Sequence, residues 1–163
     1  MRRFLCLSVA AAVAVALAVV APAAAGGKPV ITHFSFVGED AEASAFLTEF
    51  CGFDVAVFAD VRSTVREYPD GSVRETVNQR ITYTAGEQQL FEHNTFQVYF
   101  DADQEIERYT GVPFRIMDES GRVIFKDRGN VAFDRNGEIV WEHGPHPSLH
   151  STSDRNICDD LSE

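Results

Sequence analysis

The sequence lacks the short motifs that mark the common enzyme classes. It contains no Gly-x-Ser-x-Gly elbow, no His-Glu-x-x-His pair, no phosphate-binding loop and no dinucleotide fingerprint. Carboxylates are abundant, but a sequence without coordinates assigns no pair of them to acid and nucleophile roles. We therefore expect a non-enzymatic protein that binds a ligand or a partner.

Basic residues are scarce as well. The chain has 14 Lys and Arg against 25 Asp and Glu, so its formal net charge is −11 at pH 7. An acidic domain repels phosphate backbones and anionic lipid, which argues against nucleic acid and membrane surfaces as partners. The charge favours solubility outside the cell and leaves cationic partners, including metal ions, electrostatically permitted.

Long apolar runs are absent except at the start of the chain. Arg2 and Arg3 precede an apolar stretch over 5–20, and small residues at 21–25 complete the pattern of a secretory signal peptide. An uncleaved membrane anchor is the alternative, but the stretch is shorter than the ~20 residues that span a bilayer. We expect cleavage after Ala25 and a single secreted, extracellular domain over 26–163 with no membrane span. Because the leader contains two arginines and no acidic residue, its loss makes the net charge −13.

Cysteines number only three, and Cys6 leaves with the leader. Cys51 and Cys158 then form an even pair in an oxidising compartment, which predicts a disulfide. Such a bond would close most of the domain into one loop and stabilise it by roughly 2–4 kcal/mol. A free, catalytic Cys51 is the alternative, but no Cys-His signature surrounds it.

The first part of the domain predicts one strand and one short helix. Residues 30–37 are rich in aromatic and β-branched side chains, which indicates a strand. Asp40 can cap a helix over 41–50, and Gly52 can end it. Phe46 and Phe50 fall on one face of that helix.

From Phe53 onward the hydrophobic pattern has a period of two, which indicates strands. Apolar residues at 55, 57, 59, 61 and 65 alternate with polar or basic ones such as Arg62 and Arg66. The turn at 68–71 joins this strand to one over 73–83, whose outward positions include Arg74 and Arg80. Further strands are predicted over 95–100, 112–117, 122–126, 130–133 and 138–141. Gly-terminated connectors at 118–121, 127–129 and 134–137 predict antiparallel hairpins.

Seven or eight short strands in succession predict an all-β fold. We favour a small antiparallel up-and-down barrel, lipocalin-like in general shape, because closure removes aggregation-prone edges. A β-sandwich is the alternative. Several phenylalanines at inward strand positions are predicted to be core rather than an aromatic ligand site: Phe96, Phe100, Phe114, Phe125 and Phe133.

Several features together resemble small secreted proteins of actinobacteria. They are the signal peptide, the Phe50-Cys51-Gly52-Phe53 segment before the β-meander, the Gly144-Pro145-His146-Pro147 segment and the final Cys158. The resemblance spans most of the domain and supports a barrel-like fold with Cys51 paired to Cys158. That group has no established activity, so the resemblance carries over no catalytic residue.

Three histidines follow the last predicted strand: His143, His146 and His150. Neutral imidazoles suit Zn or Cu, so a loop that curls around an ion could bring the three together. Pro145 and Pro147 exclude helical spacing, and no obvious fourth donor stands nearby. A solvated loop with exposed histidines is the alternative, and no cofactor is expected to be obligatory.

Alternating oxygen-bearing side chains from Asp101 to Glu107 imitate the start of an EF-hand loop. Ile106 stands where such a loop needs glycine, and Val112 where it needs a bidentate glutamate. The segment therefore predicts an acidic connector rather than a calcium site.

Glu75, Gln79 and Tyr83 share the inward face of their strand with Val77 and Ile81. Polar groups amid an apolar lining are typical of a small-ligand site, so these three are the predicted contacts to a small apolar ligand. An edge strand, a β-bulge or the wet mouth of a barrel would also place polar groups there. Two further alternatives are metal binding by the histidines and a pocketless module that contacts an extracellular protein.

Overall fold

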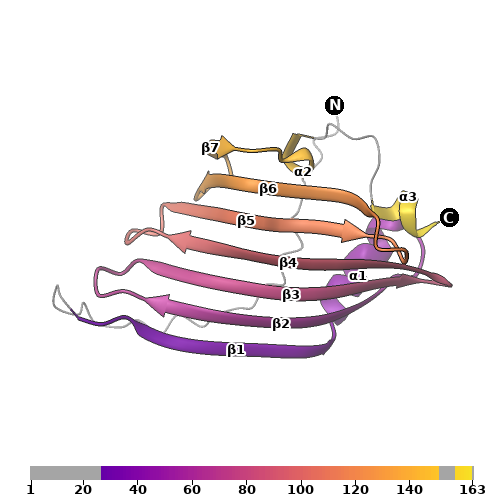
Figure 1. The fold of residues 1–163 in the computed structure, drawn as a ribbon, viewed down its shortest axis with the longest axis horizontal. Helices are drawn as coiled ribbons and strands as arrows, with labels where there is room; N and C mark the ends of the chain where they lie inside the picture. The colour runs from indigo at the N-terminus through magenta and orange to yellow at the C-terminus, as the bar shows by residue number, and fades with distance from the viewer. Residues whose placement is uncertain (1–26, 151–156, 163) are drawn as a thin grey trace.

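One seven-stranded antiparallel sheet dominates the computed structural model, which describes residues 27–150 and 157–162 (Figure 1). Each strand pairs with its neighbours in sequence, so the chain is mostly β with a short helix, as predicted. The elements are β1 (Val30–Glu39), α1 (Ala41–Cys51), β2 (Ala56–Glu67), β3 (Val73–Ala85), β4 (Gln88–Phe100), β5 (Ile106–Met117), β6 (Val123–Asp134), β7 (Ile139–His143), α2 (Pro147–His150) and α3 (Ile157–Leu161). The predicted signal peptide at 1–25 lies outside the described residues, among which no helix has the length and apolar character needed to cross a bilayer.

The sheet does not close, so the barrel predicted from the sequence is wrong. The described strands also form one sheet rather than the two of a sandwich, and β1 and β7 are its edges. The physical reason lies in the last strand, because β7 has five residues and β1 has ten, which leaves too few hydrogen-bonding groups to seal a seam. In addition, α1 packs on one end of the sheet (Figure 1).

Alternation along the strands gives the sheet two faces. The inner face packs against α1 and α3, and the apolar positions predicted at 55–65 are buried on it. Ala43 and Leu47 of α1 join Leu161 of α3 in this single core. Phe96 and Phe125 pack against it as predicted. The alternate residues of each strand lie on the outer face. The core that contains the buried residues of α1 and α3 is on the inner face.

Helix α1 forms where the sequence predicts it, for the reasons expected. The Asp40 side chain accepts a hydrogen bond from the Ala43 N–H at 2.9 Å, and Gly52 ends the helix with a φ of 77°. The Ser44 hydroxyl accepts from the Val57 N–H at 2.9 Å, which fixes the helix to the start of β2.

The predicted disulfide is confirmed. Cys51 at the end of α1 bonds Cys158 in α3, with an S–S distance of 2.04 Å and a sequence separation of 107. The bond holds a five-residue helix, too short to be stable alone, against the core beside Ile157 and Leu161.

Strand β6 differs from its prediction, because the segment 127–129 lies inside the strand and is not a turn. Gly129 adopts a φ of 125°, and a Cβ there would lie 2.1 Å from the carbonyl oxygen of His143. Glycine therefore serves a close approach between β6 and the chain leaving β7, where the Arg128 N–H donates to Pro145 O at 3.1 Å. The glycine that resembled a turn signal is a packing requirement.

Aspartates shape the hairpin turns that the sequence does predict. Asp134 Oδ1 accepts hydrogen bonds from the backbone N–H groups of Asn136 and Glu138, both at 2.9 Å. These bonds lower the pKa of Asp134. Asp101, the first residue of the EF-hand-like segment, likewise accepts from the Glu105 N–H at 2.8 Å. Its carboxylate therefore caps a strand connector.

Candidate functional site

A carboxylate lies buried on the inner face of the sheet. Glu92 is 2 % exposed, and each of its oxygens has a protein donor. Oε1 accepts from Gln79 Nε2 at 2.8 Å, and Oε2 accepts from the Tyr83 hydroxyl at 2.5 Å. Asn94 Nδ2 also donates to Oε1 and reaches the carbonyl oxygen of Pro113 at 2.7 Å. We call these four side chains the Glu92 cluster: Gln79, Tyr83, Glu92 and Asn94.

The register of β3 and β4 explains why these side chains meet. Ile81 stands opposite Glu92, so the residues two positions before and after it, Gln79 and Tyr83, are the diagonal neighbours of the carboxylate. Asn94 follows Glu92 on the same face of β4. The cluster is thus assembled by pairing between two strands and not by a local motif.

Burial governs the electrostatics of the cluster. It raises the pKa of Glu92 to about 7, although the three donors act in the opposite direction. Burial also raises the pKa of Tyr83, and the neighbouring charge of Glu92 adds to that rise. The carboxyl group therefore changes charge near neutral pH, while the phenol stays protonated and remains a donor.

The structure places the three predicted ligand contacts in two groups. Gln79 and Tyr83 meet at Glu92, and Glu75 lies farther along the inner face of β3. Near Glu75, Tyr109 donates to Glu107 Oε1 at 2.6 Å. Burial, that hydrogen bond and the charges of Glu107 and Glu75 raise the pKa of Tyr109. Ligand binding by Glu75, Gln79 and Tyr83 stays a prediction.

The three predicted metal ligands do not converge. His143 is exposed at the end of β7, and His146 is buried. His150 Nε2 lies 2.8 Å from Glu142 Oε2, so its partner is a carboxylate on β7. In the part of the chain that the structure describes, no three His, Cys, Asp or Glu residues are grouped to hold a metal ion.

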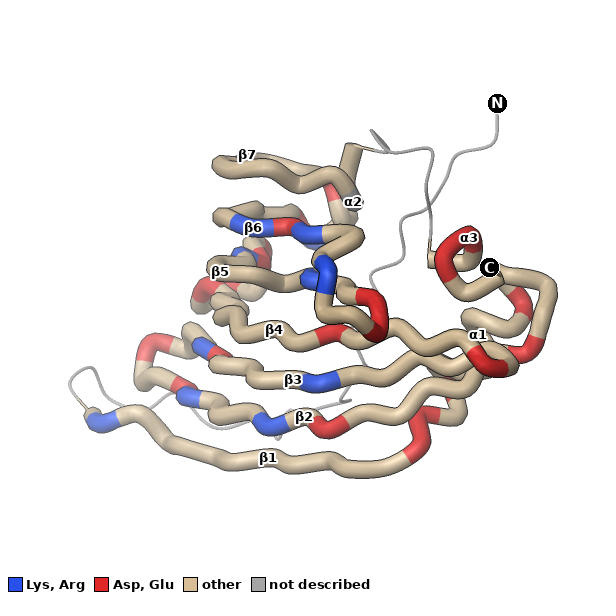
Figure 2. Tube along the Cα trace, turned by 45° about the vertical axis from the view of Figure 1, so that its right-hand side comes forward, with Lys and Arg blue, Asp and Glu red and all other residues tan. Residues whose placement is uncertain are grey.

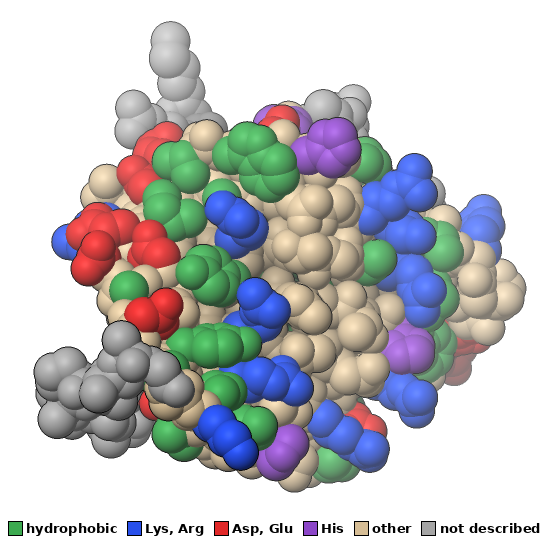
Figure 3. Space-filling model, turned by 60° about the vertical axis from the view of Figure 1, so that its left-hand side comes forward, with side chains coloured by type: hydrophobic (Ala, Val, Ile, Leu, Met, Phe, Trp, Pro, Cys, Tyr) green, Lys and Arg blue, Asp and Glu red, His purple; other side chains and the backbone are tan. Residues whose placement is uncertain are grey.

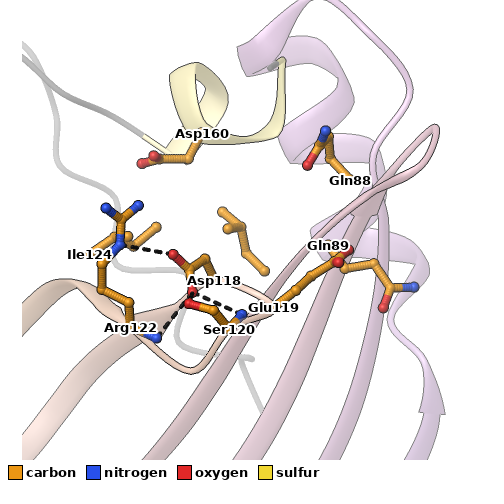
Figure 4. A pocket seen from close by; sticks show the side chains of 9 residues that line it. Gln88, Gln89, Asp118, Glu119, Ser120, Arg122, Ile124 and Asp160 are labelled. Carbon is orange, nitrogen blue, oxygen red and sulfur yellow. Dashed lines mark hydrogen bonds and ion pairs between the residues drawn. The ribbon is translucent and has the colours of Figure 1, made fainter.

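A pocket of about 230 Å³ opens where the β5–β6 turn faces α3 and the start of β4 (Figure 4). Its lining is mostly polar: Gln88, Gln89, Leu90, Asp118, Glu119, Ser120, Arg122, Ile124 and Asp160. Asp118 is already engaged, because it pairs with Arg122 at 2.9 Å and accepts from Ser120 at 2.6 Å. These contacts build the hairpin turn, so the pocket is a by-product of the turn.

The outer face of the sheet carries most of the basic side chains of the described chain: Arg62, Arg66, Arg74, Arg80, Arg108, Arg115, Lys126 and Arg128. Figure 3 shows Lys and Arg in two bands on one face, with other side chains between them. Acidic positions instead gather mainly at turns, strand ends and helices, as Figure 2 shows. The fold therefore concentrates positive charge on one face of a chain whose net charge is −11.

Strand pairing arranges this charge in rows that run across the strands. Successive partners in the first basic row, from β2 to β7, are Arg66, Arg74, Tyr99, Arg108, Ala132 and Trp141. The Arg108 guanidinium lies 5.9 Å from the centre of the Trp141 ring, close enough for a cation–π contact. Among the described residues, no carboxylate forms an ion pair with the arginines of this row.

A second basic row lies toward the end of the sheet that carries the β5–β6 turn. It contains Arg80, His93, Arg115 and Lys126 on β3 to β6. Between the two rows runs a polar band without charge, formed by Thr76, Gln97, Thr110 and Asn130. One acidic residue reaches the outer face near its middle, where Asp60 pairs with Arg62 at 3.5 Å.

Sequence reasoning missed both Glu92 and the basic face. The strand containing Glu92 was predicted to start at Thr95, whereas β4 starts at Gln88 and places Glu92 on the inner face. The signal for the basic face was present, since Arg62, Arg66, Arg74 and Arg80 fall on the polar side of two predicted strands. The net charge of the whole chain is negative, so it does not reveal this local basic face.

Comparison with known proteins adds no family to these observations. The chain matches no protein-family model, and the searches of curated proteins and of solved structures found no match to it.

Proposed function

We propose that this protein is an exported binding module that docks an anionic partner on the outer face of its sheet. The observation that carries the proposal is the gathering of arginines on that face of an acidic chain. Guanidinium groups present several N–H donors in a rigid fork that matches carboxylate and phosphate oxygens. Among the described residues, Arg66, Arg74 and Arg108 have no ion-pair partner, and such a set of arginines is typical of a surface that receives anions.

Export is part of the proposal and is supported by two features. The leader has the charge and apolar pattern of a signal peptide. The Cys51–Cys158 disulfide suits an oxidising compartment. A partner in that setting is a molecule of the cell exterior.

Chromatography on a sulfonate resin at pH 7 tests the charge argument. A protein with a net charge of −11, or −13 without its leader, should flow through such a resin, but a local basic face should retain it at low salt. The double variant Arg74→Glu with Arg108→Glu should lose retention. Arg122→Glu is the matched control, because Arg122 lies in the β5–β6 turn and pairs with Asp118. Flow-through of the unaltered protein would refute the proposal.

A second candidate function is binding of a small apolar ligand on the inner face, near Glu75, Gln79 and Tyr83. It is favoured by the Tyr109 ring, whose centre lies 6.1 Å from that of Phe96 and 6.0 Å from that of Phe133. Aromatic side chains beside a few polar groups are what small-ligand sites use. Organic extraction of protein purified from its native host, followed by mass spectrometry, should release a stoichiometric ligand. An extract with no such molecule would reject this candidate.

A further inference from the structure

We infer that the anionic partner is a linear polysaccharide bearing carboxylate groups, which lies across the strands along the first basic row. This inference rests on the proposed function and names its ligand. Carboxylates would pair with Arg66, Arg74 and Arg108, and sugar rings would lie on Tyr99 and Trp141.

The spacing of the row fits a chain of sugars. Neighbouring strands of a sheet lie about 4.8 Å apart, so the side chains of one row repeat at that interval. A pyranose unit in a linear polysaccharide has nearly the same length, so successive sugars would meet successive strands, although Ala132 on β6 is 2 % exposed and contributes no contact. Along one strand of duplex DNA, successive phosphates are instead about 3.4 Å apart along the helix axis, which does not match the spacing of the row.

The aromatic members of the row provide flat apolar surfaces of the right kind. Trp141 is 49 % exposed at the β7 edge. Tyr99 lies between Arg74 and Arg108 in the register. The C–H faces of a sugar ring pack on such rings, while the hydroxyl groups at its rim stay free to hydrogen-bond. Arg108 is held beside Trp141 by the cation–π contact, so less side-chain entropy is lost when it binds a carboxylate.

The polar band beside the row matches the hydroxyl groups of a polysaccharide. Thr76, Gln97, Thr110 and Asn130 present hydroxyl and amide groups, which both donate and accept hydrogen bonds. A lipid surface offers mostly charged headgroup oxygens and would leave the amide and hydroxyl donors and acceptors of this band largely unused. Sugars offer a hydroxyl group at nearly every position of the ring.

The net charge of the protein favours an anion of low charge density. With −11 on the whole chain, a densely charged polymer such as DNA meets repulsion from the turns and helices around the basic face. A polysaccharide with one carboxylate per sugar or fewer meets less of it. Three of the six positions in the row are arginines, and Tyr99 separates Arg74 from Arg108, which also suits spaced charges.

Calorimetric titration with polygalacturonate oligosaccharides tests the inference, with the fully methyl-esterified oligosaccharides as the uncharged control. The carboxylate form should bind and the esterified form should bind far more weakly. Arg74→Gln should weaken binding about tenfold, since a hydrogen bond to a charged group is worth somewhat more than 1 kcal/mol. Trp141→Ala should also weaken binding, although it removes no charge. Arg122→Gln should leave it unchanged, because that residue lies in a turn and pairs with Asp118.

Parallel titrations with single-stranded DNA and with anionic phosphatidylglycerol vesicles distinguish a failure of the polysaccharide inference from a failure of the proposed function. Tighter binding of DNA or vesicles, sensitive to Arg74→Gln, would overturn the polysaccharide and leave the anion-binding face intact. Equal binding of the esterified and carboxylate oligosaccharides would overturn the role of charge in the inference. Absence of binding to all anionic probes would overturn the proposed function itself.

Discussion

Glu92 takes up a proton more readily in the folded chain than in the unfolded chain. Burial raises its pKa from an ordinary value of 4.5 to about 7. Between these two pH values the folded state holds more protons, so the free energy of unfolding falls as the pH rises from 4.5 to 7. The loss from this one group totals about 3 kcal/mol and is complete above pH 7.

Replacement of the Glu92 carboxyl by an amide should remove the contribution of this group to the pH dependence of the free energy of unfolding. Glu92→Gln is expected to raise the melting temperature at pH 8 and to leave it nearly unchanged at pH 4, where Glu92 is neutral in both states. Thermal unfolding followed by circular dichroism at several pH values measures this difference. Glu119→Gln, an exposed change in the β5–β6 turn, is the control. If the melting temperature of Glu92→Gln differed from that of the unaltered protein by the same amount at every pH, Glu92 would not be the source of the pH dependence.

Gly129 carries a second prediction at the scale of one residue. Gly129→Ala introduces a Cβ that would meet the carbonyl oxygen of His143, in addition to the cost of a φ of 125°. We expect a loss of more than about 2 kcal/mol in the free energy of unfolding. Gly137→Ala isolates the backbone cost, because Gly137 also has a positive φ of 77° but open space around its Cβ. Urea denaturation that gives equal losses for the two variants would remove the steric argument.

The sequence cannot reveal Glu92 because its burial depends on a neighbouring strand. The residues Gln88 to Asn94 are mostly polar, and this composition is typical of a loop. Only the pairing of β4 with β3 brings Gln79 and Tyr83 to the carboxylate and satisfies it. Buried polar groups of this kind are decided by tertiary donors, which periodicity does not report.

At the scale of elements, the disulfide joins α1 to α3, and little else holds α3 in place. The double variant Cys51→Ser with Cys158→Ser should cost roughly 2–4 kcal/mol, as expected for closure of a long loop. It should also release α3 and expose Leu161, which is 2 % exposed in the fold. Hydrogen exchange of the α3 amides checks the second point.

Reduction of the unaltered protein is the matched control for that variant. It breaks the same bond without a substitution, so both should show the same loss of protection in α3. Protection that persists in α3 after reduction would mean that Ile157 and Leu161 hold the helix without the bond.

Element boundaries follow from the sequence where the signal is local. The ends of α1 are predictable, because Asp40 caps its first turn and Gly52 supplies the left-handed residue after it. β6 is not, because Gly129 has the same appearance in sequence as a hairpin glycine. Its true reason is a backbone approach from a strand that follows later in the chain.

For the whole molecule, alternation predicts an antiparallel meander but not its closure. Whether seven strands form a barrel depends on the length of β7 and on where α1 packs, and neither is a property of one strand. Charge behaves in the same way. The net charge of −11 can be counted from the sequence, but which charges lie on the outer face and which at the turns depends on the register of the strands.

Among the described residues, no strand pairs with the outer edge of β1, and this edge also exposes apolar side chains. Phe36 and Val37, from opposite faces of the strand, are 43 % and 62 % exposed. Such an edge favours pairing with a second copy, while the negative net charge opposes it. We therefore expect concentration-dependent association that strengthens as added salt screens the repulsion.

Sedimentation velocity over a range of protein and salt concentrations measures that association. Val37→Lys places a charge on the β1 edge, two residues before the end of the strand, and should keep the protein monomeric at high salt, since edge lysines discourage strand pairing. Val140→Lys is the matched control, because Val140 is 52 % exposed but lies on β7, an edge of only five residues. Equal suppression by both variants would mean that general charge, and not the β1 edge, governs association. A protein that stays monomeric at high salt without any substitution would contradict the prediction.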